Sequence, residues 1–159
     1  MNDFMFKADN KIYNLRSSGV LILNDKILIQ RGVEDTEYAL PGGQLKFGET
    51  GAETVIREFK EEMGVNVFVD KFLWIEEAFW KWNNSDCHTI CFYYLLKMEN
   101  PDEILSKGSI FKSEETDESR LIFKWIDLEK IDNYKIYPIF LKDEIYNIKD
   151  GIKHFIYKE

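Results

Sequence analysis

Three acidic residues, Glu58, Glu61 and Glu62, lie within one short segment of the chain. On an α-helix, side chains three and four positions apart lie on neighbouring turns of one side, so the three carboxylates would share one ridge. Carboxylates this close repel one another, and a hard cation such as Mg²⁺ relieves the repulsion while leaving coordination positions open for water and phosphate oxygens. The spacing therefore favours a divalent-metal site that acts on a phosphorylated compound.

A cation held by these glutamates, Mg²⁺ or Mn²⁺, would promote hydrolysis of a diphosphate. It would polarise the phosphoryl group, neutralise charge on the bridging oxygen, and lower the pKa of a bound water that attacks phosphorus. The competing interpretation is that an acidic run on an amphipathic helix is a solvated face, which is the usual outcome when such a run stands alone.

A helix from about residue 50 to residue 63 is predicted to carry the glutamates. Thr50 followed by Glu53 is a capping-box signature, and Gly64 marks the end of the helix. Apolar residues recur at three- and four-residue spacing and predict a stripe that packs on a sheet. They are Ala52, Val55, Ile56, Phe59 and Met63. The other stripe is acidic.

The segment before this helix, residues 40–49, contains Pro41, Gly42, Gly43 and Gly48. We expect these residues to exclude regular structure and to let the backbone approach a ligand closely. The rest of the chain predicts a mixed sheet with helices packed on it, of the α/β or α+β class. The expected elements are strands at 16–23, 26–31, 65–80, 88–98, 121–125 and 152–157, a long loop at 99–119, and a helix from 138 to about 150.

From Gly43 to Val65 the sequence is GQLKFGETGAETVIREFKEEMGV. This segment resembles the Nudix signature, G-x5-E-x7-R-E-U-x-E-E-x-G-U with U apolar, and it meets every fixed position. Those positions are Gly43, Glu49, Arg57, Glu58, Phe59, Glu61, Glu62, Gly64 and Val65. The resemblance implies an α/β/α sandwich with a mixed sheet that contains antiparallel strands, as a single domain over residues 1–159 with the signature at 43–65.

The resemblance also implies roles for the residues of the signature. Glu58 and Glu62 would be the principal metal ligands, Glu61 a ligand or base, and the backbone carbonyl of Gly42 would complete the shell. Arg57 is not expected to share the face of both its neighbours, and pairing with a carboxylate such as Glu49 would fix its orientation.

Substrate contacts are expected outside the glutamates as well. Gly43 would lie against the substrate, and the rings of Tyr38 and Trp82 could stack on a nucleobase. Many Nudix enzymes carry an extra glutamate in a late loop that binds metal or acts as a base. Here Glu118 is assigned to that place, although Glu114, Glu115 and Asp117 lie in the same loop.

The expected reaction is Mg²⁺-dependent hydrolysis of a nucleoside diphosphate linked to another moiety. Nucleoside triphosphates such as oxidised dGTP, ADP-ribose and dinucleoside polyphosphates are the candidate substrates. Phe79 and Trp80 occupy the region where a proline would resemble an ADP-ribose hallmark, which disfavours that substrate. Two alternatives are a nucleotide-binding sensor module without turnover and a prenyl diphosphate isomerase, for which Cys87 and Cys91 are poorly placed.

The composition limits the partners. A formal net charge of −8 disfavours tight binding to long DNA or RNA, whereas a divalent cation can still bridge a small phosphorylated substrate to carboxylates. We expect a cytoplasmic protein, because no segment approaches the roughly 20 apolar residues that span a bilayer and no signal peptide is evident. Zinc binding by Cys87, His88 and Cys91 is disfavoured, since on a strand His88 would point away from the cysteines. The oligomeric state is open, and a homodimer remains compatible with the sequence.

Overall fold

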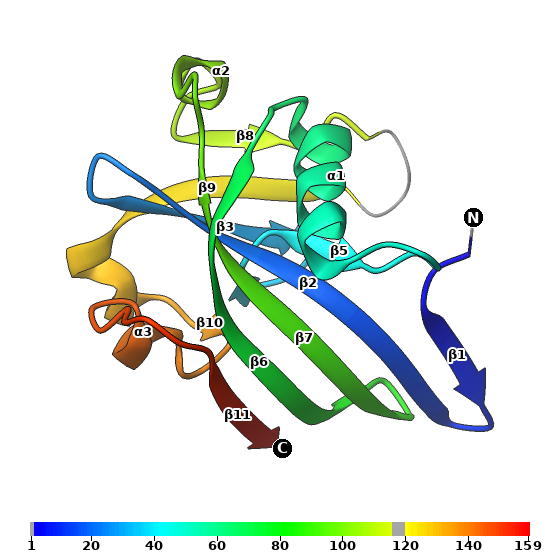
Figure 1. Cartoon of the computed structure of the whole chain (residues 1–159). Coiled ribbons are helices and arrows are strands. Elements are labelled where there is room, and N and C mark those ends of the chain that lie inside the picture. Colours follow the sequence, from blue (N-terminus) through cyan, green and yellow to red (C-terminus); the bar gives the residue numbers. More distant parts are fainter. Residues whose placement is uncertain (1, 116–119) are drawn as a thin grey trace.

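The computed structural model describes residues 2–115 and 120–159 (Figure 1). The strands are β1 (Met5–Ala8), β2 (Lys11–Leu23), β3 (Lys26–Gly32), β4 (Tyr38–Ala39), β5 (Gly42–Gln44), β6 (Phe68–Trp82), β7 (Ser85–Lys97), β8 (Ile110–Lys112), β9 (Leu121–Asp127), β10 (Ile136–Tyr137) and β11 (Lys153–Lys158). The helices are α1 (Gly51–Met63), α2 (Asp102–Leu105), α3 (Leu141–Glu144) and the 3₁₀ helix η1 (Leu128–Asn133). No helix among these residues is long and apolar enough to cross a bilayer.

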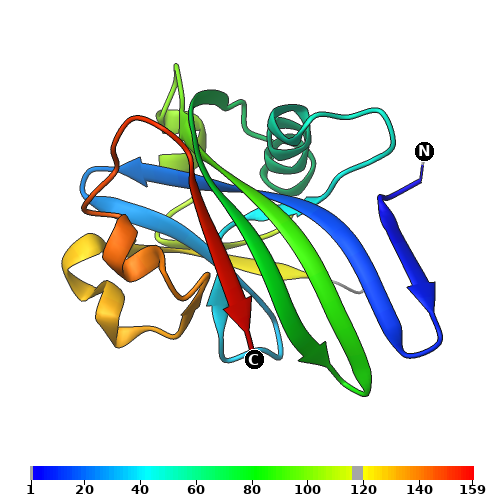
Figure 2. The same ribbon diagram turned by 60° about the horizontal axis from the view of Figure 1, so that its bottom comes forward.

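The strands form a mixed sheet in the order β10-β4-β3-β2-β7-β6-β11. The pairs β2–β7 and β6–β11 are parallel, whereas β2–β3, β6–β7 and β3–β9 are antiparallel. Strands β1 and β5 also pair with β2. In Figure 2, β1 and β11 lie at opposite edges of the long curved part of the sheet.

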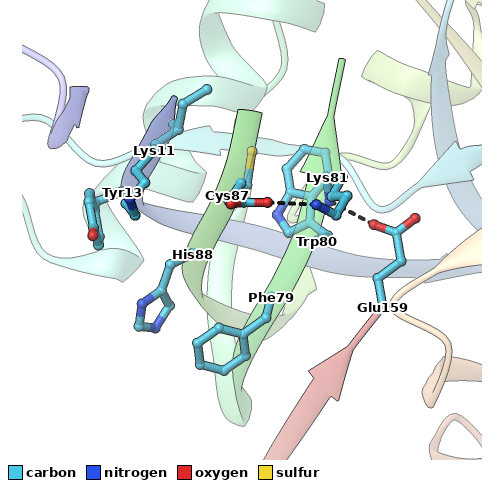
Figure 3. A pocket seen from close by; sticks show the side chains of 10 residues that line it. Lys11, Tyr13, Phe79, Trp80, Lys81, Cys87, His88 and Glu159 are labelled. Carbon is cyan, nitrogen blue, oxygen red and sulfur yellow. Dashed lines mark hydrogen bonds and ion pairs between the residues drawn. The ribbon is translucent and has the colours of Figure 1, made fainter. Parts of the chain in front are cut away.

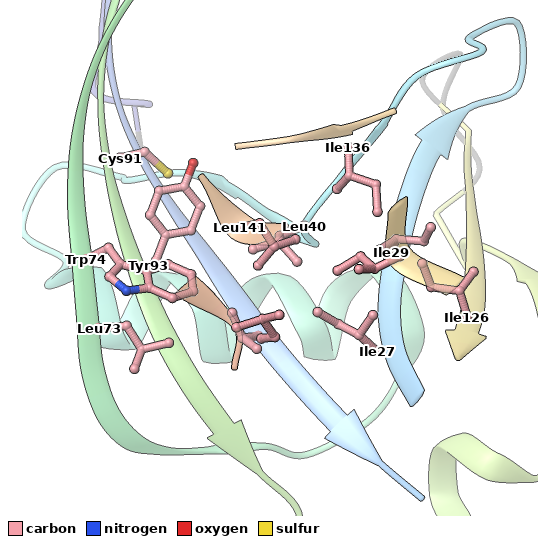
Figure 4. Close-up of a cluster of buried hydrophobic side chains, with 13 residues drawn as sticks. Ile27, Ile29, Leu40, Leu73, Trp74, Cys91, Tyr93, Ile126, Ile136 and Leu141 are labelled. Atoms are coloured by element: carbon pink, nitrogen blue, oxygen red, sulfur yellow. The ribbon is translucent and has the colours of Figure 1, made fainter. Parts of the chain in front are cut away.

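Helix α1 covers one face of the sheet, and η1 and α3 lie on the other (Figure 1). On the α1 side, Val55, Phe59 and Met63 are fully buried together with Leu21 and Leu28. The second cluster joins β3, β6, β7 and α3, and it is drawn in Figure 4. The sheet is therefore buried on both faces, as the predicted α/β/α sandwich requires.

Helix α1 begins and ends where the sequence predicts. Thr50 accepts a hydrogen bond from the Glu53 amide and Glu53 accepts one from the Thr50 amide, so the capping box is complete. Gly64 ends the helix with a φ of 69°, in the left-handed region that glycine adopts without strain. Of the expected apolar stripe, Ile56 is 37% exposed, because it lies at the edge of the packed face.

The hairpins also agree with the sequence. Asn24 and Asp25 both have positive φ, of 52° and 60°, as a two-residue hairpin turn requires. The β6–β7 hairpin has a shorter turn than the predicted strand ends at residues 80 and 88 imply. Asn83 adopts a φ of 53°, and pairing continues to Trp82 and Ser85. The strands predicted at 121–125 and 152–157 are present as β9 and β11.

The prediction of a helix from 138 to about 150 was wrong, because helix α3 ends at Glu144. The buried Leu141 and Ile145 are anchored within a single turn, while Ile139 and Tyr146 are 56% and 60% exposed. The side-chain amide of Asn147 donates to the Asp143 carbonyl, a local bond that competes with helical pairing. Little apolar burial was therefore available to hold a longer helix.

Two other segments are more regular than expected. Residues 42–44, placed in an irregular loop, form β5, because Gly42 and Gly43 pair with Ser18 and Ser17 of β2. The predicted loop at 99–119 contains α2 and β8 within its described part. Helix α2 is fixed by Ile104, which is fully buried in the core on the α1 side.

Candidate active site

The site is built on a close contact between β5 and α1. Gly43 lies directly under Glu58, and a Cβ added at Gly43 would overlap the Glu58 carboxyl group. The hydroxyl of Ser17, the residue paired with Gly43, donates to the carbonyl of Gly51 at 2.7 Å, which ties β2 to the start of α1. The glycine therefore leaves room for the Glu58 carboxyl group to lie against the strand.

Arg57 holds three carboxylates at once. Its guanidinium donates to Glu49 at 2.6 and 3.0 Å, to Glu58 at 2.9 Å and to Glu61 at 3.0 Å. The predicted pairing with Glu49 is present, and the planar group makes it in the two-bond geometry that arginine favours. The expectation that Arg57 would avoid its neighbours' face was wrong, because its long side chain curls back so that one nitrogen reaches both Glu58 and Glu61.

These contacts shift the pKa values of the pair. The Arg57 guanidinium, with help from the Lys46 amide and the Thr54 hydroxyl, lowers the pKa of Glu49 to about 2. The hydrogen bond to Glu49 in turn raises the pKa of Arg57. Both side chains are largely buried, so this pair is a fixed element of the site rather than a transient surface contact.

Glu62 is the most unusual residue of the site. It is only 5% exposed, and among the described residues its Oε2 has no hydrogen-bond partner. Burial, followed by the nearby charges of Glu58 and Glu115, raises the pKa of Glu62 to about 9, against a small opposing effect of Arg16. Burial also raises the pKa of Glu58, although Arg57 opposes the rise. Without a cation, this buried pair therefore retains a proton near neutral pH.

The donor set fits a hard divalent cation. Carboxylate oxygens are the ligands that Mg²⁺ prefers, and an unpartnered buried oxygen such as Glu62 Oε2 is costly unless something binds it. No three His, Cys, Asp or Glu side chains are already gathered as a metal cage within residues 2–115 and 120–159. Arg57 engages Glu58 and Glu61 instead, so an incoming ion would compete with it for their oxygens.

The late loop reaches the end of α1 next to Glu62. The Glu114 amide donates to the Glu62 carbonyl at 2.7 Å, while the Glu114 side chain pairs with Lys107 at 3.0 Å. The charge of the next residue, Glu115, acts on Glu62. Glu118, the acid assigned to this role from the sequence, lies outside the described residues, as does Asp117. The sequence held no local signal that could separate Glu115 from the other acids of the loop.

The two aromatic residues assigned to the substrate lie in different parts of the fold. Tyr38 in β4 is half-buried and packs edge to face on Tyr134, with the Arg31 guanidinium 6.0 Å from its ring centre. Trp82 is 53% exposed at the tip of the β6–β7 hairpin. That tip lies beside Lys11 at the start of β2, whereas Gly43 pairs with Ser17 near the middle of β2.

A cavity of about 330 Å³ opens near that tip rather than at the glutamates (Figure 3). It is lined by Tyr13, Phe79, Lys81 and His88 among others, and the His88 ring lies 4.3 Å from that of Phe79. This cavity is thus not where the carboxylates of α1 gather. We place the active site at the carboxylates, because a divalent cation is bound by oxygen ligands and does not require a large cavity.

Cys87 and Cys91 are free and buried, and burial raises the pKa of Cys91 to about 11. His88 contacts Tyr13 and Phe79 on the face away from the cysteines, as the alternation of a strand predicts. Within the described chain the three do not form a ligand cluster.

Comparison with known proteins agrees with the geometry. A model of the NUDIX domain family matches residues 14–144. The chain is similar to an ADP-ribose pyrophosphatase from Streptococcus suis, with TM-score 0.55, 16% identity, and coverage of 89% of this chain and 98% of that one. It is also similar to a MutT protein from Bacillus halodurans, with TM-score 0.60, 15% identity, and coverage of 91% and 90%.

A Nudix hydrolase from Nitrosomonas europaea is a third similar structure, with TM-score 0.60, 13% identity, and coverage of 92% and 79%. At such identities the structural similarity establishes the fold. The family match, however, spans most of the sequence and includes helix α1, which carries the three glutamates. The chain therefore belongs to the Nudix family of pyrophosphohydrolases.

Proposed function

We propose that this chain hydrolyses a diphosphate linkage in a nucleoside diphosphate joined to a further moiety, with Mg²⁺ or Mn²⁺ as cofactor. The observation that carries the proposal is Glu62, a buried acid beside Glu58 with one oxygen that has no partner among the described residues. Such a group costs folding free energy and is well suited to binding a cation.

The glutamates of α1 are the residues that would hold the ion. Glu58 and Glu62 are proposed as the principal ligands, Glu61 as a further ligand or base, and the carbonyl of Gly42 as the ligand from β5. When bound, the ion polarises the phosphoryl group and lowers the pKa of the attacking water. The raised pKa of Glu62 supports this assignment, because a proton shared by the acidic pair is what a cation would replace.

Arg57 is proposed as a positioning residue. It is bonded to Glu49, Glu58 and Glu61, so it sets the orientation of the carboxylates without needing to touch substrate. Its Nη2 also donates to the carbonyl of Gln44 at 3.1 Å, which fixes the acidic side of α1 relative to β5. Gly43, the residue of β5 that lies against the Glu58 carboxyl group, remains the proposed point of closest backbone approach for the substrate.

We assign the assisting acid of the late loop to Glu115. The assignment rests on the charge of Glu115, which acts on Glu62. A carboxylate at this place can bind a second ion or accept a proton from the attacking water.

The substrate is proposed only as a class. Two similar structures are an ADP-ribose pyrophosphatase and a MutT protein, which keeps ADP-ribose and nucleoside triphosphates, including oxidised dGTP, in the panel together with dinucleoside polyphosphates. The half-buried Tyr38 is retained as a candidate contact for the moiety beyond the diphosphate.

The test is a panel of these compounds assayed for release of phosphate, pyrophosphate or monophosphate, with Mg²⁺, with Mn²⁺ and with a chelator. We expect metal-dependent turnover of at least one compound, lowered by orders of magnitude in Glu62→Gln. Glu99→Gln, which alters an exposed acid outside the site, is the matched control and should keep wild-type activity. Tight nucleotide binding without turnover would instead favour a sensor module, and full activity of Glu62→Gln would refute the ligand assignment.

A further inference from the structure

Arg16 lies in the middle part of β2, where this strand pairs with both β5 and β7. It pairs with Gln44 of β5 on one side and with Cys91 of β7 on the other, one residue before Ser17 pairs with Gly43. Arg16 is half-buried. Its positive charge lowers the pKa of both Glu62 and Cys91, so the guanidinium lies within electrostatic reach of each.

The guanidinium of Arg16 has no protein partner in the described part of the chain. It makes neither an ion pair nor a side-chain hydrogen bond there. Arg57, by comparison, is bonded to three carboxylates, and Arg31 donates to three backbone carbonyls. The chain has 29 acidic and 21 basic residues, so acidic partners are abundant for a guanidinium. Among the described residues Arg16 is thus a half-buried guanidinium whose donors are available to bind an anion.

The charge of Arg16 acts on Glu62, although the two side chains do not touch. Glu62 Oε2 is unpartnered in the described structure, and Arg16 is not within ion-pair distance of it. Two such groups separated by a gap can be bridged by a cation beside the carboxylate and an anion beside the guanidinium. A metal-bound diphosphate supplies both, because the ion neutralises only part of its charge.

We propose that Arg16 is a substrate-binding residue whose guanidinium binds phosphate oxygens of the diphosphate next to Glu62. This inference deepens the proposed function and rests on it. Arginine suits the role because its planar fork binds two phosphate oxygens together. Arg57 cannot serve in its place, since its nitrogens are already occupied by the glutamates and by Gln44.

The experiment separates anion binding from metal binding. Titration calorimetry measures the affinity of wild type, Arg16→Gln and Arg16→Lys for Mn²⁺ alone, and then for methylenediphosphonate in the presence of Mn²⁺. Lys130→Gln is the charge-matched control, because Lys130 lies 65% exposed on η1, away from the glutamates. Circular dichroism confirms that each variant is folded.

We expect Arg16→Gln to bind methylenediphosphonate about 10- to 100-fold more weakly, the effect of losing a charge-assisted pair of hydrogen bonds. Its Mn²⁺ affinity should be unchanged or slightly higher, because a positive charge near the ion has been removed. Arg16→Lys should fall between the two, since it keeps the charge and loses the fork. Lys130→Gln should match wild type in both titrations.

Undiminished diphosphonate binding by Arg16→Gln would overturn the inference, as would a parallel loss of Mn²⁺ affinity, which would mean that Arg16 acts on the glutamates. If Arg16→Gln does not fold, Arg16→Lys decides: wild-type diphosphonate affinity in that variant would overturn the inference equally. If the wild-type protein itself binds neither probe, the proposed function falls and the role of Arg16 falls with it. Binding of both probes by wild type with no effect of Arg16 refutes this inference alone.

Discussion

Replacing Glu62 with glutamine is expected to stabilise the metal-free protein at neutral and alkaline pH while it removes activity. The pKa of Glu62 rises from 4.5 to about 9 on folding, chiefly because the group is buried. The folded protein therefore holds this proton more tightly than the unfolded chain does. Its contribution to stability is fully present below pH 4.5 and declines as the pH rises toward about 9.

The magnitude follows from the pKa shift. Each pH unit above the unfolded pKa costs ~1.4 kcal/mol of free energy of unfolding, so at about pH 7 the cost has an upper limit of ~3 kcal/mol. Glu58 shares the proton and the surroundings relax, so we expect a gain of ~1–2 kcal/mol for Glu62→Gln, or a rise in Tm of about 2–8 °C.

The assay is urea unfolding of both proteins with a chelator present, repeated between about pH 5 and pH 9. The difference in free energy of unfolding between variant and wild type should grow with pH. Glu99→Gln should show no such trend. Added Mg²⁺ should stabilise the wild type more than Glu62→Gln, because only the wild type keeps the full ligand set. A difference that stays flat across this pH range would refute the assignment of Glu62 as a buried, strained acid.

Three further changes test other parts of the site. Gly43→Ala should leave the protein folded but lower kcat by at least about 100-fold, because the new Cβ displaces the Glu58 carboxyl group. Gly48→Ala, where nothing lies near the new atom, should cost only ~1 kcal/mol of stability because of the positive φ at that position. Steady-state kinetics and thermal unfolding distinguish the two effects. Arg57→Lys should lower both stability, by about 2 kcal/mol, and kcat, because a single ammonium cannot hold three carboxylates, and unchanged kinetics would contradict its positioning role. Thr50→Ala should lower the free energy of unfolding by ~1 kcal/mol through loss of the cap and leave kcat per folded molecule unchanged.

Local signals explain what the sequence predicted well. The start of α1 was predictable because the Thr50 cap and its partner Glu53 lie three residues apart, and the end because Gly64 takes a conformation that other residues avoid. The Arg57–Glu49 pair was predictable because both residues belong to one continuous sequence pattern, with Glu49 just before the helix cap and Arg57 in the helix that follows. These features need no information from distant parts of the chain.

Features that depend on distant contacts were missed. β5 exists because two glycines meet Ser17 and Ser18 across a long sequence separation, which no local pattern reveals. Helix α3 is short because only one turn of the segment after Pro138 packs its apolar side chains into the core. Nothing in the sequence singled out Arg16. Its role is inferred from the absence of a bonded partner among the described residues and from its effect on the pKa of Glu62.

Binding of Mg²⁺ to the wild-type protein, measured by titration calorimetry in two buffers of different ionisation enthalpy, tests the metal site most directly. At about pH 7 we expect each bound ion to release about one proton, because the cation replaces the proton that the buried pair of glutamates retains. Glu62→Gln should bind the ion far more weakly and release no proton. Equal affinity in the two proteins, or binding with no proton released by the wild type, would contradict the assignment of the α1 glutamates as the metal site.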